Sequence, residues 1–185
     1  RENGKALADA AAPGDWVVTM PIGEPPYYWD TPNNLREKRY PTRWELDEVA
    51  PNNPVYIRPI WGYWRHIQPL DSVANSLALK LAGIDAKFQS PTAEIELERD
   101  AKSGEYNGII HEWTYMPIAE LSYFSMAPRF THDDRVDGIK RAMTNLNSTA
   151  TTSVLEEHGA ARDLIQAYQD VNRDGTASVR ANLVF

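Results

Sequence analysis

The 185-residue sequence contains no cysteine, which excludes disulfides, thiolate nucleophiles and thiolate-based zinc sites. It has no apolar run of about 18 residues, so we expect no membrane helix and no membrane partner. No Lys- or Arg-rich patch stands out in a chain of formal net charge −7, which argues against nucleic acid as a partner. No signal-peptide pattern is visible, and the sequence leaves the cellular compartment open.

The common chemical motifs are also missing. There is no P-loop, no G-x-G-x-x-G and no G-x-S-x-G elbow. The four histidines, which are His66, His111, His132 and His158, show neither His-x-His nor i, i+4 spacing around a Glu. A metal site needs three or more converging ligands. We therefore expect no metal ligand and no cofactor in this chain.

The clearest element is a strand, helix and strand over residues 150–185. Residues 151–155 are rich in β-branched side chains, and apolar residues recur at helical spacing from Ala160 to Val171. Asp174-Gly175 ends this helix, and polarity then alternates over residues 179–185. We predict a parallel pair because a whole helix connects the two strands.

The earlier part of the chain reads as short elements joined by loops. We predict a helical segment over residues 1–12, strands over 15–22 and 55–60, and a hairpin over 94–113 with its tip at Ser103-Gly104. Thr42 and Glu45 predict a capping box and a short helix to Val49. Further helices are predicted over 71–82, 116–126 and from Thr131 to about Asn145.

Thirteen prolines and six tryptophans indicate loop-rich structure with aromatic packing. Two aromatic segments, residues 27–29 and 61–66, are candidates for a substrate pocket. Their candidate residues are Tyr28, Trp29, Trp61, Trp64, Arg65 and His66. The alternative is that the rings cap a hydrophobic face and that the Arg stacks on one of them.

Glu156 and His158 follow the first strand of the C-terminal unit, where α/β enzymes place functional groups. We predict pocket contacts for both side chains and assign no catalytic residue. The alternative is that these groups only stabilise the start of the following helix.

Three segments resemble the amidohydrolase family 3 group of metal-dependent hydrolases, which includes N-substituted formamide deformylases. They are TRWELDEVAPNNPVYIRPIWGYWRHIQPLDSVANSLALKLAGI from Thr42, GIIHEW from Gly108 and TTSVLEEHG from Thr151. Ala150 departs from the Gly that usually precedes the last of these.

The resemblance implies an α/β fold: part of a TIM-like barrel, represented by one βαβ unit, with an α+β insertion. On this map residues 1–14 are a helical lead-in, residues 15–126 the insertion that shapes the pocket, and residues 127–185 the barrel segment. The family's metal ligands lie on barrel strands outside this sequence. The resemblance thus implies a divalent metal, with zinc as the first candidate, in the full-length parent protein.

The resemblance implies a segment of a hydrolase that cleaves the C–N bond of a small amide-type substrate, inactive as this chain alone. The alternative is a non-catalytic α/β module that binds a ligand or a partner. Because Arg1 is no initiator and the βαβ unit lacks the rest of its sheet, we expect truncation at both ends. Open strand edges also predict a homo-oligomer.

Overall fold

The computed structural model describes residues 2–22, 32–33, 35–60, 68–156 and 161–184. The chain folds as two compact units, unit 1 (Arg1–Pro128) and unit 2 (Arg129–Phe185). Unit 1 contains helices α1 (Glu2–Ala10), α2 (Arg43–Val49), α4 (Ser76–Leu81) and α5 (Ile118–Ser122), and strands β1 (Val17–Thr19), β2 (Val55–Ile57), β3 (Leu70–Ala74), β4 (Ile95–Arg99) and β5 (Tyr106–Glu112). Unit 2 contains α6 (His132–Ser148), β6 (Ser153–Glu156), α7 (Arg162–Arg173) and β7 (Arg180–Leu183).

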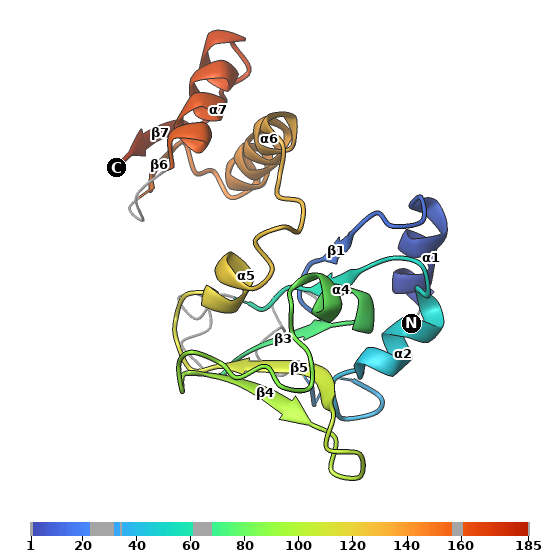
Figure 1. The fold of residues 1–185 in the computed structure, drawn as a ribbon. Helices are drawn as coiled ribbons and strands as arrows, with labels where there is room; N and C mark the ends of the chain where they lie inside the picture. Colours follow the sequence, from blue (N-terminus) through green and yellow to red (C-terminus); the bar gives the residue numbers. More distant parts are fainter. Residues whose placement is uncertain (1, 23–31, 34, 61–67, 157–160, 185) are drawn as a thin grey trace. The chain divides into compact units, whose positions relative to one another are not determined.

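The described strands of unit 1 form one mixed sheet in the order β1-β2-β3-β5-β4 (Figure 1). β1 and β2 are parallel, whereas β2, β3, β5 and β4 pair antiparallel with their neighbours. Alternate residues of a strand face opposite sides, so the sheet has an apolar cluster on each face. On one face Tyr56 stacks on Phe124 with ring centroids 4.4 Å apart. On the other, Val73 and Ile109 pack with Leu46 of α2.

Unit 2 confirms the predicted strand, helix and strand. β6 and β7 pair in parallel, with Val154 opposite Ala181, and α7 connects them. Ala167 and Val171 of α7 pack with Ile139 and Met143 of α6 in a separate apolar cluster. α7 ends at Asp174, where Gly175 has a φ of 69°, a conformation that glycine adopts without steric strain.

Local sequence signals placed several further elements correctly. Glu45 accepts a hydrogen bond from the backbone N–H of Thr42 at 2.9 Å, as the predicted capping box requires. A second capping box joins Thr131 and Asp134 at the start of α6. These hydrogen bonds to Thr131 hold the pKa of Asp134 below its usual value. The hairpin of β4 and β5 also forms as predicted.

The predicted helix over residues 71–82 is wrong in its first half. Leu70–Ala74 is strand β3, and only Ser76–Leu81 is helical. Pairing of β3 with both β2 and β5 satisfies its backbone groups, and this overrides the helical spacing of its apolar residues. The strands predicted over 15–22 and 55–60 and the helix predicted over 116–126 are shorter than expected, at β1, β2 and α5.

The architecture is mixed α/β, as predicted. The assignment of residues 1–14 to a lead-in, of residues 15–126 to an insertion and of residues 127–185 to part of a TIM-like barrel stays a prediction. None of the helices within the described ranges combines the length and the apolar character that crossing a bilayer needs.

Candidate functional site

Most of the pocket residues predicted from sequence lie outside the described residues. These are Tyr28, Trp29, Trp61, Trp64, Arg65, His66 and His158. Glu156 is described: it is the half-buried last residue of β6, and its carbonyl accepts a hydrogen bond from the N–H of Val184 at 3.0 Å. Burial, and secondly the charge of Glu156, raise the pKa of Tyr168 on α7.

The structure instead assembles a polar cluster across β3, β5 and β4. His111 of β5 lies between two carboxylates: its Nδ1 is 2.7 Å from Oδ1 of Asp71, and its Nε2 is 3.0 Å from Oε2 of Glu98. Nδ2 of Asn107 donates to the other oxygen of Glu98 at 2.6 Å. We call these four residues the His111 cluster.

Strand register explains how residues so far apart in the sequence meet. Asp71 lies directly opposite His111 on β3, so the two side chains share one face of the sheet. On β4 the residue opposite His111 is Glu96, and the carboxylate that reaches the ring belongs to its diagonal neighbour, Glu98. The register shifts between Leu97 and Arg99 at this point.

The two carboxylates raise the pKa of His111 to about 9. The hydrogen bond to Asp71 is the largest cause; partial burial opposes it, and the hydrogen bond to Glu98 adds to it. His111 is therefore an imidazolium at neutral pH that donates from both nitrogens. It joins three neighbouring strands, which makes the cluster an ionic clamp on the sheet.

The His111 cluster does not fit a resident metal. A histidine binds a metal through a free nitrogen lone pair, but both ring nitrogens of His111 face carboxylates. Nor do any three His, Asp or Glu side chains in the described part of the chain converge in a way that would hold an ion. A metal of the parent protein would need ligands from elsewhere.

We expect the stability of unit 1 to fall as pH rises through the pKa of His111. Its folded pKa, about 9, lies above the ordinary value of 6.5, so the folded state binds the extra proton. The stabilisation is present below about pH 6.5, and about 2–3 kcal/mol should be lost between pH 6.5 and 9. Urea unfolding followed by tryptophan fluorescence measures it, because all six tryptophans lie in unit 1.

Two variants control this measurement. His111→Gln should flatten the pH dependence over this range. Glu96→Gln removes a neighbouring carboxylate that does not contact the ring and should leave the pH dependence intact. A wild-type profile that runs parallel to that of His111→Gln would contradict the ionic clamp.

On the opposite side of β5, Glu112 anchors the start of α5. This carboxylate is only 2% exposed and accepts hydrogen bonds from the N–H of Ile118 at 2.5 Å and of Ala119 at 3.1 Å. Glu120, in the first turn of α5, pairs with Arg58 at 2.6 Å. Acidic groups are favourable at a helix N-terminus. Glu112 thus joins the start of α5 to β5, and Glu120 joins it to Arg58, the residue after β2.

Comparison with known proteins identifies the protein family of this chain. The Amidohydrolase family matches this chain over residues 4–183, and the chain belongs to that family. It is 41% identical over 149 residues to an N-substituted formamide deformylase from Arthrobacter pascens, covering 76% of this chain and 24% of that protein. The sequence resemblance is thus confirmed.

A solved structure supports the fold. The chain resembles an uncharacterized metal-dependent hydrolase from Pyrococcus horikoshii OT3, with a TM-score of 0.52 and 19% sequence identity. The match covers 98% of this chain and 30% of that one. The chain therefore spans about a quarter to a third of these relatives' length, and the matches support a segment of a hydrolase.

Proposed function

We propose that this chain is part of a metal-dependent amidohydrolase that hydrolyses the C–N bond of a small amide-type substrate. The observation that carries the proposal is the 41% identity to an N-substituted formamide deformylase, together with the family match over nearly the whole chain. N-substituted formamides are therefore the first substrate class to test.

The proposed enzyme holds a divalent metal, preferably zinc, outside this segment. Such a metal supplies a nucleophile at neutral pH by lowering the pKa of bound water. The described residues of this chain contain no set of ligands for it. In this proposal the segment contributes substrate contacts, and the metal ligands come from barrel strands beyond it.

Residues 15–126, which lie in unit 1, are proposed as the insertion that shapes the substrate pocket, and residues 127–185, which include unit 2, as part of a TIM-like barrel. Tyr28, Trp29, Trp61, Trp64, Arg65 and His66 would line the pocket, with Glu156 and His158 at the barrel mouth. The parallel pairing of β6 with β7 supports the second assignment, because barrel strands are parallel. The open edges of this two-stranded pair also support self-association of the isolated chain.

The test compares the full-length protein with the 185-residue chain. Formate released from an N-substituted formamide is measured for both, before and after chelation and with zinc restored. We expect the full-length protein to lose activity about 100-fold or more on chelation and to recover it with zinc. The 185-residue chain should be inactive under all three conditions.

Two results would overturn the proposal. Metal-dependent hydrolysis by the 185-residue chain would place the ligands within it. Absence of amide hydrolysis by the zinc-loaded full-length protein would favour the alternative, a non-catalytic module that binds a ligand or a partner.

A further inference from the structure

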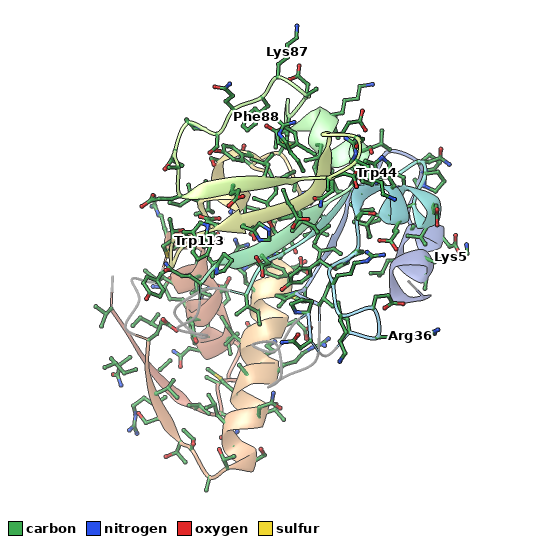
Figure 2. The ribbon with its side chains drawn as sticks, turned by 90° about the horizontal axis from the view of Figure 1, so that it is seen from below. Lys5, Arg36, Trp44, Lys87, Phe88 and Trp113 are labelled. Atoms are coloured by element: carbon green, nitrogen blue, oxygen red, sulfur yellow. The ribbon has the colours of Figure 1, made fainter. Side chains whose placement is uncertain are left out.

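Five large hydrophobic side chains are exposed between the end of β5 and Leu121 of α5, namely Trp113, Tyr115, Met116, Ile118 and Leu121. Trp113 is 49% exposed, Met116 37%, Ile118 39% and Leu121 42%. Ile118 and Leu121 are three residues apart and share one face of α5. Figure 2 labels Trp113, which directly follows the last residue of β5. Single exposed apolar residues are common, but a group this dense in the sequence makes this segment a candidate interaction surface. We call it the α5 surface.

The backbone under the α5 surface is held in place. The N–H of Trp113 donates to the carbonyl of Glu94 at 2.7 Å, and Nε2 of Gln68 donates to the carbonyl of Trp113 at 2.8 Å. Glu112 fixes the first turn of α5 through the N–H groups of Ile118 and Ala119. The apolar side chains therefore project from an ordered framework, which lowers the entropy lost on binding.

The composition of this segment is that of an interface core. Residues 113–119, WTYMPIA, contain no charged side chain. Interface cores are depleted of charge and enriched in Trp, Tyr and Met. The one carboxylate that follows, Glu120, is buried and paired with Arg58, the residue after β2, and does not add an open charge to the surface.

We infer that the α5 surface packs against the remainder of the parent hydrolase chain. This inference rests on the proposed function, because it takes that hydrolase as the occupant. The chain covers 24% of the formamide deformylase and 30% of the solved hydrolase, so whole proteins of this kind carry much further polypeptide. A surface tethered to its partner in one chain binds at high effective concentration, which favours this occupant over a second copy.

The test measures oxidation of Met116 by hydroxyl radicals in the full-length protein, native against denatured. An exposure of 37% alone should slow oxidation by about threefold, whereas packing should slow it about tenfold or more. Leu121→Lys in the full-length protein should return Met116 toward the threefold value. Leu81→Lys alters an exposed leucine of α4, outside this surface, and should leave the protection unchanged.

Protection of only about threefold in the native full-length protein would overturn the inference. Protection that increases with protein concentration would also overturn it, because the occupant would then be a second copy. The formate assay separates this from the proposed function. An active protein with Met116 unprotected contradicts the inference alone, and a protected but inactive protein contradicts the proposed function alone.

Discussion

Replacing Gly108 with alanine is expected to destabilise unit 1 by about 3–5 kcal/mol, a large share of a domain's usual stability. Gly108 lies within β5 at a φ of 97°, a region that side chains strongly disfavour. A Cβ there would overlap the carbonyl oxygen of Ala74 and lie 2.8 Å from the Cβ of Arg43. Both neighbours belong to structured segments, the end of β3 and the first residue of α2, so relief requires backbone movement.

Gly104 provides the matched control for this substitution. It lies at the tip of the same hairpin with a φ of 73°, but a Cβ there would meet nothing within 4 Å. Gly104→Ala should therefore cost only the conformational strain, about 1–2 kcal/mol. Urea unfolding followed by tryptophan fluorescence measures both variants. Equal losses for the two would show that the close approach at Gly108 contributes nothing.

Replacing Asn75 with alanine is expected to cost about 3–5 kcal/mol, because three buried polar groups lose their partner. Asn75 is completely buried and caps α4. Its Oδ1 accepts from the N–H of Val55 at 2.9 Å and of Ala78 at 3.0 Å, and its Nδ2 donates to the carbonyl of Asn53 at 2.9 Å. One side chain thus joins β2, α4 and the turn before β2.

Asn52→Ala controls for the general effect of removing an Asn side chain in unit 1. Asn52 is exposed, and its substitution should change the free energy of unfolding by no more than about 0.5 kcal/mol. Asn75→Asp keeps the two acceptor contacts and loses the donor contact, so its stability should not exceed that of wild type. A loss below about 1 kcal/mol for Asn75→Ala would mean that water replaces the missing amide.

The sequence predicted those elements whose signals are local. The capping residues Thr42 and Thr131 act within three residues of their own backbone, and the tip at Ser103-Gly104 lies between the two strands it joins. Residues 71–82 show where prediction from local signals fails. The choice between strand and helix for β3 depends on β2 and β5, which lie elsewhere in the sequence. Asn75, an N-cap residue in the middle of this segment, was the signal that a helix begins only there.

The His111 cluster was missed for the same reason. We judged the histidines by their spacing along the chain, whereas Asp71 and Glu98 reach His111 through strand pairing. The predicted hairpin already placed the carboxylates of β4 across from β5. Asp71 lies opposite His111 only because residues 70–74 form strand β3. The predicted helix over 71–82 gave no reason to expect this contact. The pocket residues predicted from the aromatic segments lie outside the described residues and remain predictions.

The protonation of His111 also changes how the molecule should move in an electric field. The formal charge of −7 counts every histidine as neutral. With His111 as an imidazolium at pH 7 the charge is −7 + 1 = −6. In native electrophoresis near neutral pH the protein should therefore migrate toward the anode more slowly than a charge of −7 predicts. His111 loses its proton, and the net charge becomes more negative, only as the pH approaches 9.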